Sequence, residues 1–287
     1  MSSGVNDYIE LTKPRITWLI LMSTAIGYYF GHQGSWSFWP IFHVIVGTGL
    51  IASGTAALNQ WYEREADVKM RRTQGRPIPS GRVTPARAFW FGMALEVLGS
   101  LELWLGLNAL TSLLGIATIL LYLCAYTPLK QKTWWSTTVG AIPGAIPPLI
   151  GYAAASGTLR ADAWVLFAIL FIWQFPHFYA IAWMYREDYS RAGIRMLPVV
   201  EPDGVSTSRQ ILLYSVLLIP ISLLPHWLGM SGSIYLVGAL AMGLMFLYSG
   251  IRVSFDRTRV RARRVLLASV IYLPVLYGLM VLDPARL

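Results

Sequence analysis

The long segments without a charged side chain constrain this chain more than any other feature. Residues 16–62 contain no Asp, Glu, Lys or Arg. Further segments of this kind cover residues 103–129, 133–159, 163–185, 210–251 and 265–282. A helix needs about 20 apolar residues to cross the hydrocarbon core of a bilayer, so these segments predict membrane-spanning helices. The mean hydropathy of +0.53 and the 13% of charged residues exclude an ordinary soluble domain.

Turn-forming residues divide the two longest charge-free segments. Gly, Ser and Pro residues gather at 31–40 and at 225–233, where each segment is expected to fold back on itself. The predicted spans are 14–31, 38–62, 86–106, 108–126, 134–153, 162–184, 210–227, 232–251 and 263–282. The fifth span contains Pro143, Pro147 and Pro148, which predict a broken or kinked helix. The expected fold is therefore an all-α polytopic membrane bundle of about nine helices, with residues 1–287 forming a single domain.

The basic residues predict the orientation of this bundle. If the nine spans alternate in direction, 21 of the 23 Lys and Arg residues fall at the N-terminus and in the even-numbered connections. The positive-inside rule places these segments in the cytoplasm. Anionic lipid head groups at that face account for the pI of 9.8, so no nucleic-acid partner is expected. Because the first residues show neither a cleavable signal pattern nor a transit-peptide composition, we expect a bacterial inner membrane.

Three oxygen-bearing side chains recur every four residues at the end of the second predicted span. Asn59, Glu63 and Asp67 have this spacing, and four residues turn a helix by about 400°, so the three lie on one helical face. Like charges at this spacing destabilise a helix unless a cation lies between them. Oxygen ligands of this kind suit Mg²⁺, which binds one or two carboxylates together with water and substrate phosphate. The alternative is a solvated helix end.

Basic side chains directly follow this acidic cluster. Arg71, Arg72 and Arg76 lie within ten residues of Asp67, and guanidinium groups match the geometry of phosphate oxygens. The combination indicates a site for a metal-bound diphosphate. A second polar cluster, at residues 173–198, follows the sixth predicted span on the same side of the membrane. The two clusters are expected to enclose one site facing the cytoplasm, the alternative being ordinary interfacial charge.

Both clusters resemble motifs of a known family. Asn59-x3-Glu63-x3-Asp67, followed by Arg-Arg-Thr-x2-Arg-Pro, resembles the first acidic motif of the UbiA-type intramembrane prenyltransferases. Trp-Gln-Phe-Pro-His-Phe at 173–178 and Asp-Tyr-x2-Ala-Gly-x2-Met-Leu-Pro at 188–198 are similar to the branch that transfers a farnesyl group to protoheme. This resemblance implies farnesyl diphosphate and protoheme as substrates, Mg²⁺ as the metal, and heme O for haem-copper oxidases as the product.

The resemblance also implies roles for single residues. Asn59, Glu63 and Asp67 would hold the metal, and Arg71, Arg72 and Arg76 the diphosphate. Tyr185 and Tyr189 occupy the positions where other members carry a second acidic pair. Asp188 is therefore expected to supply the second motif's carboxylate to the metal. Tyr185 is a candidate for stabilising the allylic cation.

The resemblance further points to a histidine for the acceptor. Imidazole is a common ligand of haem iron, and His177, beside Pro176, is the expected contact of this kind.

Two other functions fit the sequence less well. One is a prenyltransferase of the same fold with a quinone-precursor or chlorophyll-type acceptor, and the other is a transporter with polar residues in its broken fifth helix. The sequence leaves open whether a downstream haem oxidase binds the protein.

Overall fold

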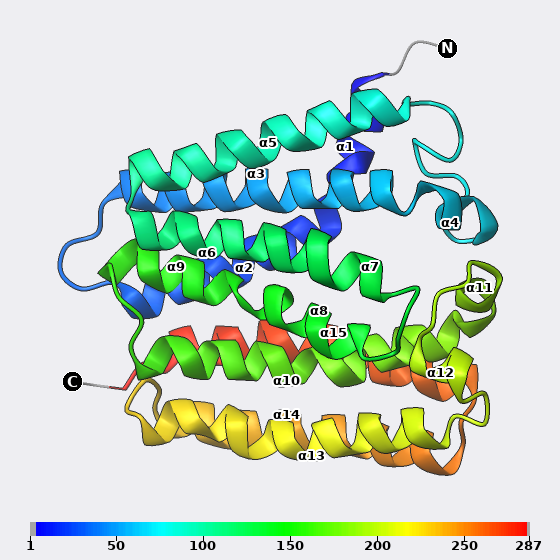
Figure 1. The fold of residues 1–287 in the computed structure, drawn as a ribbon. Helices are drawn as coiled ribbons and strands as arrows, with labels where there is room; N and C mark the ends of the chain where they lie inside the picture. Colours follow the sequence, from blue (N-terminus) through cyan, green and yellow to red (C-terminus); the bar gives the residue numbers. More distant parts are fainter. Residues whose placement is uncertain (1–3, 286–287) are drawn as a thin grey trace.

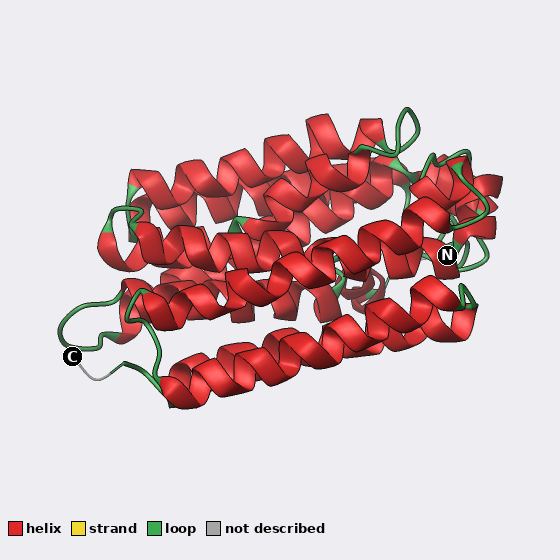
Figure 2. Ribbon diagram, turned by 90° about the horizontal axis from the view of Figure 1, so that it is seen from below, coloured by secondary structure: helices red, strands yellow, loops and turns green. Residues whose placement is uncertain are grey.

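The computed structural model describes residues 4–285, and helices make up nearly all of this part (Figures 1 and 2). The long helices are α2 (Pro14–Gly31), α3 (Phe38–Tyr62), α5 (Pro85–Gly106), α10 (Ala161–Met184), α13 (Val205–Trp227), α14 (Ser233–Phe255) and α15 (Arg259–Leu282). The shorter ones are α1 (Val5–Leu11), α4 (Arg64–Lys69), α6 (Ala109–Leu120), α7 (Thr127–Leu129), α8 (Ser136–Ala145), α9 (Pro147–Ser156), α11 (Arg186–Arg191) and α12 (Leu197–Val200). A π-helical turn, η1 (Leu121–Tyr126), joins α6 to α7.

The predicted spans match the observed helices closely. Among the described residues, eight helices are long and apolar enough to cross a membrane, counting α6 to α7 as one and α8 to α9 as one. The remaining expected span is α2, an 18-residue helix with the predicted bounds, which packs along α9 and α3. The protein is therefore a multi-pass, all-α membrane protein, as the sequence predicts.

The fifth predicted span is broken where its prolines indicate. Helix α8 ends at Ala145 and α9 begins at Pro147, because Pro147 and Pro148 have no backbone N–H to continue the helical hydrogen bonds. The prediction of a broken span is confirmed. Helix α9 packs closely against α2: a Cβ on Gly151 of α9 would lie 1.8 Å from the carbonyl oxygen of Thr24.

Both polar clusters lie at one end of the bundle. Figure 1 shows α4 near α11 and α12 at this end. Hydrogen bonds confirm the proximity, because the backbone N–H groups of Arg71 and Arg72 each donate to the carboxylate of Asp188 over 3.4 Å. Helix α1 joins the same end, since Arg82 forms ion pairs with Asp7 and Glu10. The fold therefore gathers segments distant in sequence around one site.

Candidate active site

The three oxygen-bearing residues of the first cluster line a cavity of about 190 Å³, called here the inner cavity. The N–H of Glu63 donates to the carbonyl of Asn59 over 2.9 Å, and the N–H of Asp67 donates to the carbonyl of Glu63 over 2.8 Å. The four-residue helical spacing thus continues across the junction of α3 and α4. All three side chains are buried. The structure therefore brings together the three residues that the sequence predicts as metal ligands.

Each of these three side chains contacts a cationic group. The ammonium group of Lys13 donates to Asn59 Oδ1 over 3.0 Å, and that of Lys130 donates to Glu63 Oε1 over 2.7 Å. Arg76 donates to both carboxylate oxygens of Asp67, over 2.9 and 2.8 Å. Because a buried carboxylate is stable only when paired, these contacts explain how Glu63 and Asp67 lie one turn apart.

Burial and these ion pairs shift the pKa values of three groups. Burial alone raises the pKa of Glu63, but Lys130, with Lys13 and Arg76, outweighs it and holds that pKa below its ordinary value. Burial lowers the pKa of Lys130, but Glu63 and two tyrosines raise it well above the usual value. Burial and the charge of Arg76 lower the pKa of Lys13 to about 7. Glu63 and Lys130 are thus an ion pair, whereas the charge of Lys13 costs free energy in this site.

Sequence reasoning missed Lys13 and Lys130. Lys13 precedes α2 in the left-handed backbone region, with φ of 48°, and lies 46 residues from its partner Asn59. Lys130 follows α7 and lies 67 residues from Glu63. In the sequence both are ordinary basic residues at the ends of spans, which indicate orientation only. A possible signal for Lys130 is the run of Tyr122 and Tyr126 before it, because both rings line the inner cavity beside its ammonium group.

The predicted diphosphate-binding arginines divide between two cavities. Arg72 and Arg76 line the inner cavity. Arg71 does not; it lines a second cavity, called here the outer cavity, which Arg72 also borders. The structure thus places two of the three predicted arginines at the three oxygen-bearing side chains.

The second motif also faces the outer cavity. The Asp188 carboxylate pairs with Arg191 and accepts the N–H groups of Arg71 and Arg72, so it holds the loop after α4. The Tyr185 ring lies under the guanidinium of Arg72, 4.9 Å from centroid to carbon. Both residues line the outer cavity, whereas Tyr189 lines the inner one. Within residues 4–285 no cluster of three or more His, Cys, Asp or Glu side chains could hold a metal.

His177 lies on α10 next to Phe178, which lines the inner cavity, but His177 itself turns toward α15. Its Nδ1 is 2.8 Å from the hydroxyl of Ser269, and its ring stacks on Trp173 with centroids 4.7 Å apart. The Ser269 hydroxyl donates its one hydrogen to the carbonyl of Leu266 over 2.7 Å, so it can only accept from His177. His177 Nδ1 therefore carries the hydrogen, and Nε2 keeps a free lone pair.

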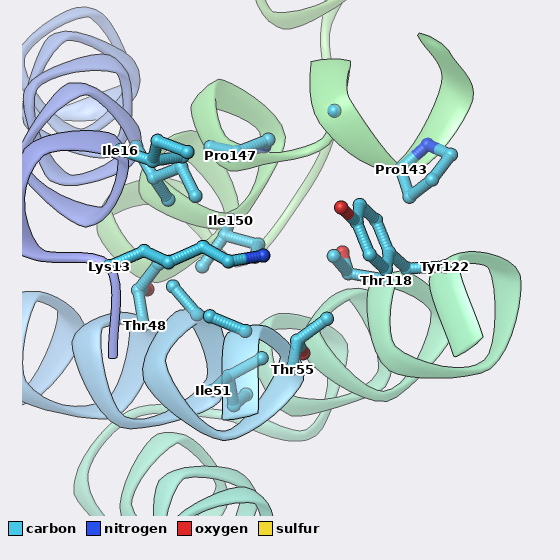
Figure 3. Close-up of a pocket in the computed structure, with 14 residues that line it drawn as sticks. Lys13, Ile16, Thr48, Ile51, Thr55, Thr118, Tyr122, Pro143, Pro147 and Ile150 are labelled. Atoms are coloured by element: carbon cyan, nitrogen blue, oxygen red, sulfur yellow. The ribbon is translucent and has the colours of Figure 1, made fainter. Parts of the chain in front are cut away.

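An apolar cavity of about 110 Å³ adjoins the inner cavity (Figure 3). Lys13, Ile16 and Tyr122 line both cavities. The other walls of the apolar cavity are Ile20, Thr48, Ile51, Ala52, Thr55, Ala56, Thr118, Pro143, Gly144, Pro147 and Ile150. A charged pocket thus lies beside an apolar one, an arrangement suited to a ligand with an anionic head and a hydrocarbon tail.

Comparison with known proteins identifies the family. The model of the UbiA prenyltransferase family matches residues 20–272. The chain belongs to this family. A protoheme IX farnesyltransferase from Solibacter usitatus is 65% identical over 97% of this chain and 99% of the relative. One from Koribacter versatilis is 45% identical over 99% and 94% of the two chains. The protein is therefore a UbiA-type prenyltransferase, as its motifs predict.

Solved structures of other membrane proteins share the fold. A structure described as digeranylgeranylglyceryl phosphate synthase in membranes superposes with a TM-score of 0.81 over 99% of each chain, at 17% identity. A UbiA homolog from Archaeoglobus fulgidus, solved with GPP and Mg²⁺ bound, superposes with a TM-score of 0.72 over 96% of this chain and 99% of that one, at 14% identity. At these identities the likeness establishes the fold alone.

Proposed function

We propose that this prenyltransferase transfers the farnesyl group of farnesyl diphosphate to a vinyl group of protoheme, with addition of water, and releases diphosphate. The 65% identity to the Solibacter usitatus protoheme IX farnesyltransferase, over nearly the full length of both chains, is the observation that carries the proposal. The inner cavity and the adjoining apolar cavity support it, because together they match a diphosphate with an isoprenoid tail.

The inner cavity fits both a magnesium ion and a diphosphate. Asn59, Glu63 and Asp67 supply one amide and two carboxylate oxygens, which is the donor set that Mg²⁺ accepts when substrate phosphate and water complete its octahedron. Magnesium, when bound, neutralises the departing diphosphate. Four cationic side chains of the same cavity would hold the diphosphate oxygens by charge-assisted hydrogen bonds: Lys13, Arg72, Arg76 and Lys130. Arg71, which the sequence groups with them, lines the outer cavity instead. The predicted role of Asp188 as a further metal ligand stays a prediction.

The apolar cavity would receive the farnesyl chain and keep water from the reacting carbon. The C1–O bond breaks and its electron pair leaves with diphosphate, giving an allylic cation. Water would quench this cation to an alcohol, and the apolar walls of the cavity would prevent this by excluding water. The faces of Tyr122, Tyr126 and Phe178 would stabilise the positive charge. A vinyl carbon of protoheme then attacks C1. Water adds to the cation left on the porphyrin side and releases a proton.

The acceptor and the membrane face of the site follow from the same residues. His177 would bind the haem iron through Nε2, the nitrogen whose lone pair is free. The active site would face the cytoplasm of a bacterial inner membrane, because the basic loops surround the inner cavity. Residues 1–287 would act as one domain.

The test is a defined assay with purified protein in nanodiscs, protoheme, farnesyl diphosphate and Mg²⁺. We expect mass spectrometry to detect porphyrin heavier by one farnesyl group plus one water, and a chelator to abolish this product. Asp67→Asn should lower turnover by at least about 100-fold, because it removes a charged metal ligand. Glu65→Gln, which changes an exposed carboxylate of the same short helix, should keep full activity. Prenylation of a quinone precursor but not of protoheme would refute the proposed acceptor.

A further inference from the structure

The outer cavity is larger than the inner one and is rich in arginine. It has a volume of about 410 Å³ and is lined by Arg71, Arg72, Met184, Tyr185, Glu187, Asp188, Arg191 and Arg259. Four of these eight side chains are cations and two are carboxylates. It lies where the loop after α4, the start of α11 and the first residue of α15 meet.

Two guanidinium groups converge on one ring in this cavity. The Arg72 guanidinium carbon lies 4.9 Å from the centroid of Tyr185, and that of Arg259 lies 5.9 Å from the same centroid. Two cations held near one ring repel each other, and an anion between them would relieve this repulsion. Arg259 is also the first residue of the 24-residue helix α15, whose N-terminal N–H groups add to the positive potential.

The carboxylates of the outer cavity do not neutralise these arginines. Asp188 is already paired with Arg191 and with the backbone of the loop after α4. Glu187 is exposed at the start of α11. The ion pairs among the described residues include neither Arg71 nor Arg259. The outer cavity therefore has an excess of positive charge and suits an anionic ligand.

The diphosphate does not need this second cavity. Lys13, Lys130 and Arg76 already lie at the three oxygen-bearing residues of the inner cavity. Arg72 is the one arginine that lines both cavities. An anionic group in the outer cavity would thus lie next to the diphosphate site without occupying it. The second substrate is the molecule that must reach the same reacting carbon.

We propose that the outer cavity binds the propionate carboxylates of the porphyrin acceptor, with Arg71 and Arg259 as their principal partners. This inference rests on the proposed function, which makes protoheme the acceptor. Protoheme has its two vinyl groups on one edge and its two propionates on the opposite edge. Charged carboxylates stay at the water-facing surface unless they are paired, whereas the vinyl edge is apolar. With the propionates at the arginines, the vinyl edge points toward the membrane-embedded part of the bundle.

The test compares protoheme with protoheme dimethyl ester, whose propionates are uncharged. Binding is measured by absorbance titration of the full chain in nanodiscs of zwitterionic lipid. The wild type should bind the diacid about tenfold more tightly than the diester, as expected for one charge-assisted contact. Arg259→Gln should weaken diacid binding about tenfold and leave diester binding and the KM for farnesyl diphosphate unchanged. Arg259→Lys should keep most of the preference because it keeps the charge.

Matched variants make the result specific. Arg263→Gln removes an exposed arginine one turn further along α15 that does not line the outer cavity, and it should leave both affinities unchanged. Arg71→Gln is the second variant, with the same selective loss of diacid binding expected, so the test does not depend on the folding of one protein.

Four outcomes would overturn the inference. Equal binding of diacid and diester by the wild type would show that the outer cavity does not bind the propionates, and would leave the proposed function intact. Equal weakening of both porphyrins by Arg259→Gln would mean that the arginine supports the fold. A change confined to the KM for farnesyl diphosphate would assign the cavity to diphosphate. An effect of Arg259→Gln that requires phosphatidylglycerol would assign it to a lipid head group. If the wild type bound neither porphyrin, the proposed function itself would fail.

Discussion

Single residues of the site depend on partners that are remote in the sequence. His177 illustrates this, because its predicted role in haem binding requires a free ring nitrogen. The hydroxyl of Ser269, 92 residues away, fixes the hydrogen on Nδ1, and the stacked ring of Trp173 limits rotation of the imidazole. Ser269 is in turn fixed by its own hydrogen bond to Leu266. The two side chains act as one unit in which Ser269 positions His177.

Removing the Ser269 hydroxyl should therefore weaken haem binding. In Ser269→Ala the hydrogen of His177 is free to occupy either nitrogen, so we expect protoheme affinity to fall about tenfold, as is typical when the outer partner of a metal-binding histidine is lost. The absorbance bands of the histidine-bound haem should weaken in parallel. His177→Ala should have at least the same effect, and farnesyl diphosphate binding should change less in both variants.

Two further variants separate this role from packing. Ser269→Thr keeps the hydroxyl and should restore the spectrum of the wild type. Ser215→Ala removes another buried serine that donates to the carbonyl one turn before it, and it should leave haem binding unchanged. An unaltered haem spectrum in Ser269→Ala would show that the serine does not position His177.

At the level of helices, the contact between α2 and α9 sets the width of the apolar cavity. Ile16 and Ile20 of α2 line that cavity together with Pro147 and Ile150 of α9, and Figure 3 shows Ile16, Pro147 and Ile150 among its walls. Glycines let the two helices approach, since a Cβ on Gly27 would lie 1.9 Å from the carbonyl oxygen of Pro148.

Adding one methyl group at this contact should destabilise the protein. In Gly151→Ala the new Cβ meets the backbone of α2, which cannot move aside as a flexible side chain would, so we expect a loss of about 2 kcal/mol in the free energy of unfolding. Thermal unfolding in detergent measures it as a lower Tm. Gly278→Ala in α15 has no atom within 4 Å of the new Cβ and should keep or slightly raise the Tm. Equal Tm values for the two variants would contradict the role of the α2–α9 contact.

For the molecule as a whole, the question is which end of the bundle faces the cytoplasm. The end that holds the inner and outer cavities also carries the loop after α4 and the N-terminal helix α1, joined through Arg82. The opposite end carries the connection between α9 and α10, with Arg160. The distribution of basic residues predicts that the first end is cytoplasmic.

Cysteine labelling checks this orientation. In a Cys124→Ala background, a membrane-impermeant maleimide should label Thr158→Cys in intact spheroplasts, and should label Gln74→Cys only in inverted vesicles. Both positions are exposed in the structure, so access depends on the side of the membrane. Labelling of Gln74→Cys in intact spheroplasts would reverse the predicted topology.

The sequence by itself determined the features that depend on local periodicity and composition. Charge-free segments located the helices, Pro147 located the break in the fifth span, and the four-residue spacing of Asn59, Glu63 and Asp67 placed three oxygen ligands on one face. These properties follow from the bilayer as solvent and from helix geometry, which act on neighbouring residues.

Only the tertiary structure decided which side chains meet across helices. The pairing of Lys13 with Asn59 and of Lys130 with Glu63 depends on how α2 and η1 pack beside α3, and no local pattern encodes it. The same holds for Arg71, which the sequence grouped with Arg72 and Arg76 but which the turn after α4 directs into the outer cavity. Contacts of this kind arise from the packing of whole helices. Which side chains are buried and which charges pair depends on the helix surfaces that touch, and not on neighbouring residues in the sequence.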